Sequence, residues 1–150
     1  MTVAINFKQL YETDDYLWLL ETVELLKQKK FNELDLENLI EELESMGKRD
    51  VNKAKSLIRQ IIIHLLLLQY WQLENQINFH HWRGEIKTFR YDLNNHLTTN
   101  LKNKLREDLI NIYHSALDFV QEKTAFYVNF PPECPYTLEQ LLDQDYLPEK

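Results

Sequence analysis

The sequence predicts an all-α protein, and three observations support that fold class. Apolar residues recur every three or four positions through most of the chain, as they do on one face of an α-helix. All four prolines lie at or after residue 131. The only two glycines are Gly47 and Gly84, so little interrupts a helix before the prolines begin. We therefore expect a bundle of about five mostly antiparallel helices with an extended, proline-containing C-terminal tail packed on its outside.

The centre of the predicted bundle is the stretch from Leu57 to Trp71, which reads LIRQIIIHLLLLQYW. A helix over these residues is apolar on nearly every side, and such a helix must be surrounded by other elements. Its most apolar run, Ile61 to Leu68, is much shorter than the roughly 20 residues of a membrane span, and His64 interrupts it. We expect a long, buried third helix from Lys48 to about residue 73, and no membrane anchor.

Two shorter helices are predicted before it. The first begins near Thr13 or Asp14, either of which can cap it, and ends in the lysine-rich segment at residues 27–30. Its predicted buried face consists of Tyr16, Leu19, Leu20, Val23 and Leu26. The second begins after Asp35 and ends at Gly47, which suits the left-handed residue that terminates many helices. Its predicted inner face consists of Leu36, Leu39, Ile40, Leu43 and Met46.

Two more helices and the tail complete the prediction. Residues 74–81 show no clean period and are expected to connect the third helix to a fourth, which runs from Trp82 to about residue 97. A fifth helix starts at Thr98 or Thr99 and ends near residue 126. In the tail, residues 129–150, Thr137 and Gln140 form a capping box for about one helical turn. The tail's leucines and tyrosines are too apolar for a free end, so we expect it to pack on the bundle.

Length, charge and cysteine content limit the classes of protein. A chain of 150 residues fits one domain, residues 1–150. Its single cysteine, Cys134, cannot form an intrachain disulfide, and the start MTVAINFKQLYETDD lacks a secretory signal pattern, so we expect a cytoplasmic protein. The net charge of −7 disfavours a surface that neutralises many phosphates, and nucleic acid is not the expected partner.

Local basic patches are the exception to that average. They open the third helix and flank Trp82: Lys48, Arg49, Lys53, Lys55, Arg59, Arg83, Lys87 and Arg90. The second helix, by contrast, has carboxylates and no Lys or Arg between Phe31 and Gly47. If these two helices fold back as a hairpin across Gly47, their charges neutralise each other, which explains the basic patch without a nucleic acid.

Several stretches resemble a known family. They are YETDDYLWLLETVELLKQKKFNELDLENLIEELESMG, HLL from His64, WRGEIKTFR from Trp82, and CPYTLEQLLDQDYLP. Over about residues 9–148 the chain resembles the bacterial family known as domain of unknown function 29. The resemblance implies a small all-helical bacterial protein and supplies no activity. The chain departs from the family pattern in having HLLLL where the family tends to have HLLKW, and HLTTNL where it tends to have a Pro-Ser-Leu turn, so no role is expected for that lysine or turn.

The candidate residues for chemistry are Glu42, His64, Asn38 and Arg90. Glu42 and Asn38 lie at the rim of the second helix's apolar face, and His64 interrupts the aliphatic run of the third. If Glu42 and His64 meet, they form a general acid/base pair, and Asn38 and Arg90 then line a polar pocket with them. A metal site needs three or four protein ligands, and no spacing selects a third among Asp14, Asp35 and His114, so we expect no metal and no other cofactor.

For function, the sequence favours a non-catalytic protein-interaction or structural module, with a homo-oligomer or a protein partner as the options. Its apolar residues exceed what one buried stripe per helix needs. The interaction candidates are the large side chains that fall off their stripes: Trp18, Leu25, Trp71 and Tyr91. The alternative is a small enzyme or small-anion binder built on Glu42 and His64.

Overall fold

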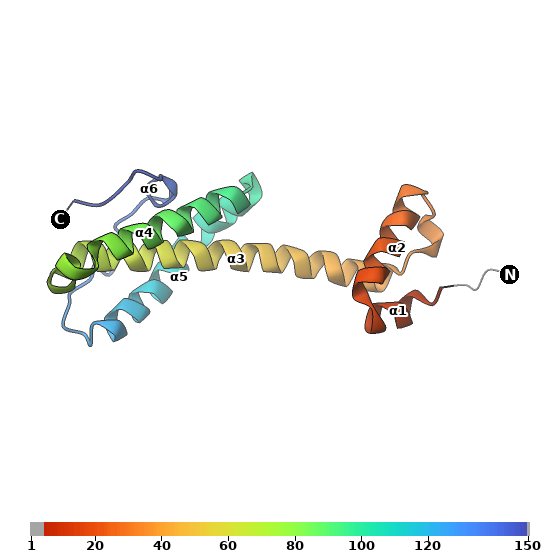
Figure 1. Ribbon diagram of the computed structural model, residues 1–150, viewed down its shortest axis with the longest axis horizontal. Coiled ribbons are helices and arrows are strands. Elements are labelled where there is room, and N and C mark those ends of the chain that lie inside the picture. Colours follow the sequence, from red (N-terminus) through yellow and green to blue (C-terminus); the bar gives the residue numbers. More distant parts are fainter. Residues whose placement is uncertain (1–4, 150) are drawn as a thin grey trace. The chain divides into compact units, whose positions relative to one another are not determined.

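The computed structural model describes residues 5–149, and those residues form helices and connections without a strand (Figure 1). The elements are α1 (Phe7–Thr13), α2 (Asp15–Lys27), the short 3-10 helix η1 (Phe31–Glu33), α3 (Leu36–Tyr70), α4 (Gln72–His96), α5 (Thr99–Lys123) and α6 (Leu138–Leu142). The all-α prediction is confirmed. Contacts divide the chain into two compact units, Met1–Arg49 and Asp50–Lys150, and α3 contributes residues to both.

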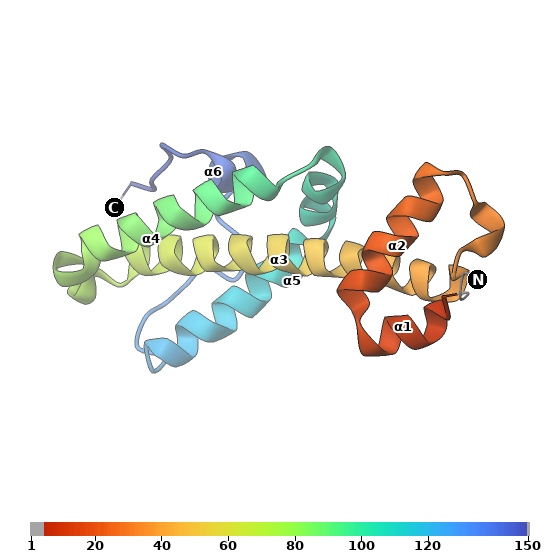
Figure 2. The same ribbon diagram turned by 45° about the vertical axis from the view of Figure 1, so that its right-hand side comes forward.

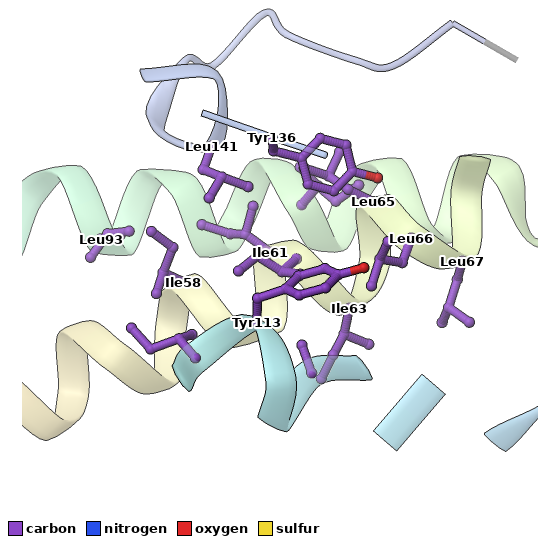
Figure 3. Packing of buried hydrophobic residues seen from close by; sticks show 14 of the residues in the cluster. Ile58, Ile61, Ile63, Leu65, Leu66, Leu67, Leu93, Tyr113, Tyr136 and Leu141 are labelled. Atoms are coloured by element: carbon purple, nitrogen blue, oxygen red, sulfur yellow. The ribbon is translucent and has the colours of Figure 1, made fainter. Parts of the chain in front are cut away.

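In the C-terminal unit, α4 and α5 pack along the second part of α3 (Figures 1 and 2). The predicted core stretch is buried here: all the aliphatic residues from Ile61 to Leu68 are at most 3% exposed. Figure 3 shows Ile61, Leu65 and Leu66 among side chains of the neighbouring elements, including Leu93 of α4 and Tyr113 of α5. Other elements therefore pack around this apolar part of α3, as the hydrophobic effect requires.

The tail packs on this unit, as predicted. Tyr136, Leu138 and Leu141 are buried in the same core cluster, and the Tyr136 hydroxyl donates to the side-chain oxygen of Gln69 at 2.9 Å. The predicted capping box is present, since Thr137 and Gln140 exchange hydrogen bonds between side chain and backbone at the start of α6. α6 is therefore a short, capped helix that buries Leu138 and Leu141.

The start of α4 differs from the prediction. Residues 74–81 are helical and not a connection, and Trp71 alone separates α3 from α4. Asn75 explains how so abrupt a junction is tolerated. Its buried side-chain amide donates to the Leu68 carbonyl at 2.6 Å, which satisfies one of the carbonyls left free at the end of α3.

In the N-terminal unit, an unpredicted helix, α1, precedes the first predicted one. Asn6 caps it by accepting from the Gln9 backbone at 3.2 Å. Asp14 then caps α2 by accepting from the Leu17 backbone at 3.0 Å, which decides between the two predicted starts. The end of α2 is also as predicted: Lys29, just beyond it, has a φ of 59°, in the left-handed region.

Gly47 does not end a helix. α3 runs through it without interruption, and no glycine in the described chain has a positive φ. The predicted hairpin across Gly47 is therefore wrong. A glycine inside a helix is less favourable than alanine by only about 1 kcal/mol, which the hydrogen bonds of a continuing helix outweigh.

Replacing Gly47 with alanine is expected to stabilise the protein by about 0.5–1 kcal/mol, because alanine has the higher helix propensity. A Cβ atom added at Gly47 meets no atom of the described residues within 4 Å, so no clash opposes the gain. Chemical denaturation followed by circular dichroism measures it. The matched control is Gly84→Ala, also inside a helix and also free of contacts within 4 Å. A loss of stability in Gly47→Ala alone would contradict the continuous helix.

Candidate functional site

Glu42 and His64, the predicted acid/base pair, have different surroundings. Both lie on α3 with several turns of helix between them, and they belong to different compact units. No hydrogen bond joins them in the described structure, and each has its own partners.

Glu42 is held by two neighbours in the N-terminal unit. The Tyr11 hydroxyl donates to its Oε1 at 2.7 Å, and the Arg49 guanidinium lies 4.0 Å from its Oε2. The hydrogen bond to the Glu42 carboxylate is the largest cause of a pKa of about 12 for Tyr11, raised from 10.0. Glu42 also lines a pocket of about 220 Å³ together with Asp15, Tyr16, Trp18 and Leu19. Its carboxylate thus has a partner at each oxygen, a close one at Oε1 and a distant one at Oε2, beside a small acidic and aromatic pocket.

Asn38 supports the start of α3. Its amide donates to Asp35 Oδ2 at 2.7 Å, and the Trp18 indole N–H donates to the same oxygen at 3.4 Å. The other carboxylate oxygen of Asp35 is buried and has no hydrogen-bond partner among residues 5–149. Trp18, Asp35 and Asn38 therefore form a structural link between α2 and α3, and Asn38 has no contact with Glu42 or His64 among its hydrogen bonds.

His64 makes the contacts of a core histidine. Its Nδ1 lies 2.7 Å from the Gln60 carbonyl oxygen, so this nitrogen carries the proton and donates. The ring is half-buried, with its centroid 5.4 Å from that of Phe89. Burial lowers the pKa of His64 below its usual value, which keeps the imidazole neutral at pH 7. These contacts hold the ring in place, and the carboxylate that acts on it, Glu85, raises its pKa by less than burial lowers it.

Arg90 attaches the tail to α4. The side chain is 1% exposed, and its guanidinium donates to the backbone carbonyls of Leu141, Tyr146 and Gln140 at 2.9, 2.7 and 3.0 Å. Burial lowers the pKa of Arg90, which stays protonated at physiological pH. The sequence placed Arg90 in a polar pocket and missed this structural role. The available signal was its position four residues after Ile86 and three before Leu93, on the apolar side of α4.

The apolar stripes of the N-terminal unit are exposed, in contrast to the prediction. The α2 stripe has side chains between 37% and 68% exposed: Tyr16, Leu19, Leu20, Val23 and Leu26. The α3 stripe has side chains between 49% and 58% exposed: Leu36, Ile40, Leu43 and Met46. The predicted burial of these residues is wrong; of the predicted inner face, only Leu39 is partly buried. The interior of the unit is formed instead by the other side of α2, where Trp18 and Thr22 are each 1% exposed.

The four interaction candidates divide accordingly. Trp18 is inside the N-terminal unit and offers no surface, and Leu25 is partly buried there. Trp71 is partly buried and its ring stacks on that of Trp82 at 6.0 Å between centroids. Tyr91 is 63% exposed and remains a candidate for contact with a partner. The exposed stripes replace Trp18 as the main candidate surface.

Two basic residues near the start of the predicted third helix, Lys55 and Arg59, contact side chains of α5 and not those of the acidic second predicted helix. Lys55 lies 2.8 Å from Asp108, and this hydrogen bond is the main cause of a lowered pKa for Asp108. Arg59 donates to the Ser115 hydroxyl at 2.8 Å and lies over the Phe119 ring, 5.5 Å from its centroid. Intramolecular contacts thus occupy part of the basic patch, although the predicted acidic partner helix is not the one that supplies them.

Across residues 5–149, no group of three or more His, Cys, Asp or Glu side chains is arranged to hold a metal ion. In the same part of the chain, no helix combines the length and apolar character required to cross a bilayer. Cys134 donates to the Tyr136 carbonyl, and burial raises the pKa of its thiol, which disfavours the reactive thiolate form.

The geometry defines an all-helical protein with a well-packed C-terminal unit and an N-terminal unit whose apolar stripes are exposed. The chain belongs to the family described as Domain of unknown function DUF29, whose model matches residues 10–147 and so covers residues of both units. No curated protein and no solved structure matches the chain. The family membership confirms the resemblance found in the sequence and assigns no activity.

Proposed function

We propose that this protein is a non-catalytic, cytoplasmic protein-interaction module and that its N-terminal unit carries the binding surface. The observation that supports the proposal is the exposure of the α2 and α3 stripes. Large apolar side chains at helical spacing are ordinarily buried, and contiguous exposed apolar surface on a protein marks a place where another surface docks. The single cysteine, which cannot form an intrachain disulfide, is the support for the compartment.

The alternative, a small enzyme or anion binder built on Glu42 and His64, has no contact in its favour among the described residues. Glu42 is held by Tyr11 and Arg49, and His64 donates to a carbonyl of its own helix. Neither Asn38 nor Arg90 has a hydrogen bond to either of them. General acid/base catalysis requires its groups within reach of one substrate, so we do not advance this function.

Site-specific photocrosslinking in the cell tests the proposal. A photoreactive amino acid is placed at Leu20 or at Ile40, one position in each stripe, and as a control at Lys104, an exposed polar position on α5. We expect irradiation to give discrete adducts, identified by mass spectrometry as polypeptides, from the two stripe positions and not from Lys104. An adduct with a second copy of the chain would identify self-association. Absence of adducts from both stripe positions would show that neither stripe is a binding surface.

A further inference from the structure

The α3 stripe has the spacing of a coiled-coil seam. Leu36, Ile40 and Leu43 follow one another at intervals of four and three, the repeat that keeps one side of a helix against a second helix. All three are more than half exposed. An extended peptide has its side chains alternating at a period of two and cannot match this spacing along its length. The expected occupant of the α3 stripe is therefore another helix.

The edge of the α3 stripe is acidic. Glu37 and Glu44 directly follow Leu36 and Leu43, in the positions that flank a coiled-coil seam and face the flanking residues of the second helix. Glu37 has one weak ion pair, with Lys8 at 3.9 Å, and both Glu37 and Glu44 are exposed. Glu44 has no ion-pair partner in residues 5–149. The two exposed carboxylates can therefore form ion pairs with a basic partner helix and disfavour an acidic one.

These charges argue against a second copy of the chain as the occupant. A symmetric antiparallel pairing of two α3 stripes sets the carboxylates of Glu37 and Glu44 against their own counterparts, and like charges in these positions destabilise a coiled coil. No Lys or Arg lies between Phe31 and Gly47 to relieve that repulsion. A helix with Lys or Arg beside its apolar stripe, by contrast, forms ion pairs along the same edge.

We propose that the α3 stripe binds an amphipathic helix of another protein in which Lys or Arg residues flank the apolar face. This inference rests on the proposed function and adds the chemistry of the partner to it. The apolar side chains supply the area that drives association, and the acidic edge selects among amphipathic helices and fixes their register.

Two synthetic peptides test the inference with the full chain. Both are designed amphipathic helices of about three heptads with the same Leu/Ile stripe. One has Lys at the flanking positions and the other Glu. Fluorescence anisotropy is expected to show that the Lys peptide binds at least about tenfold more tightly, with a preference that shrinks at high salt. The Glu37→Gln/Glu44→Gln variant is expected to lose most of that preference. Glu107→Gln/Glu122→Gln, with the same change in net charge at exposed positions on α5, is expected to keep it.

Other results of these experiments would contradict particular parts of the inference. If both peptides bind equally, or if Glu37→Gln/Glu44→Gln keeps the full preference, the charge selection is wrong while an apolar binding surface remains. If Ile40→Ser and Leu43→Ser do not lower the affinity for the Lys peptide, that peptide does not bind the α3 stripe, and the inference is wrong. If light scattering shows a dimer that Ile40→Ser dissociates, the occupant is a second copy. Absence of crosslinks from both Leu20 and Ile40 would contradict the proposed function itself.

Discussion

Replacing Arg90 with methionine is expected to detach the tail from α4 and to lower the free energy of unfolding of the C-terminal unit by about 3–5 kcal/mol, from the loss of three hydrogen bonds. Methionine fills much of the space of the arginine but donates no hydrogen bond. The carbonyls of Gln140, Leu141 and Tyr146 then lose their donor, and a buried carbonyl without a partner is unfavourable by roughly 1–3 kcal/mol. Urea denaturation measures the change in stability, and limited proteolysis measures exposure of residues 131–149.

Two further variants show whether the three hydrogen bonds are the cause. Arg90→Lys keeps the charge but not the planar fork of donors, so an intermediate loss is expected. Asn94→Ala removes one more exposed hydrogen bond to the tail, to the Leu142 carbonyl at 3.1 Å, and is expected to change stability by less than about 1 kcal/mol. An Arg90→Met protein with wild-type stability and a protease-resistant tail would show that the apolar contacts of Tyr136, Leu138 and Leu141 hold the tail without the guanidinium.

Replacing Trp18 with alanine is expected to destabilise the N-terminal unit by about 3–5 kcal/mol, the range for truncation of a large buried aromatic side chain. Trp18 is 1% exposed, packs edge-on against Tyr11 at 4.9 Å between ring centroids, and donates to Asp35. Hydrogen exchange is the suitable measurement because it reports each helix separately. Protection is expected to fall in α1 and α2 and to persist in α4 and α5.

The control substitutions lie on the opposite side of α2 and on α3. Leu20→Ser and Leu43→Ser remove side chains that are 46% and 58% exposed, and each is expected to change the stability of the unit by no more than about 0.5 kcal/mol. Trp18→Phe keeps most of the packing and loses the indole N–H, so the stability of its N-terminal unit is expected to lie between those of the wild type and Trp18→Ala. If Leu20→Ser proved more damaging than Trp18→Ala, the interior of the unit would be the face that the sequence predicted.

Much of the C-terminal unit, and the start of α2 in the N-terminal unit, was predictable because the signals are local. The aliphatic run around Ile62 and Leu66 has no polar side to expose, so its burial followed from composition. The caps at Asp14 and Thr98 and the capping box of Thr137 and Gln140 are short motifs whose geometry involves only a few neighbouring residues. These features are present as predicted, and with them the approximate limits of α2, α5 and α6.

The burial of side chains in the N-terminal unit and the contacts of the candidate site residues were harder to predict, because they depend on residues far apart in the chain. α2 has apolar residues on two sides, and periodicity identified both without indicating that Trp18 would turn inward and Leu20 outward. Glu42 was recognised as a carboxylate at an apolar rim, but its partner, Tyr11, lies on a helix that the sequence analysis did not predict. Arg90 was named for chemistry, yet its bonds go to three carbonyls in the tail.

The sequence by itself determined that this chain is helical, where most of its helices lie, and that the middle of α3 is enclosed, since these depend on backbone hydrogen bonds and on the aversion of aliphatic side chains for water. Tertiary structure decided which side of α2 is interior and what Arg90 binds. The physical reason is that periodicity shows which residues share a face of a helix, whereas burial of that face depends on which other segment packs against it.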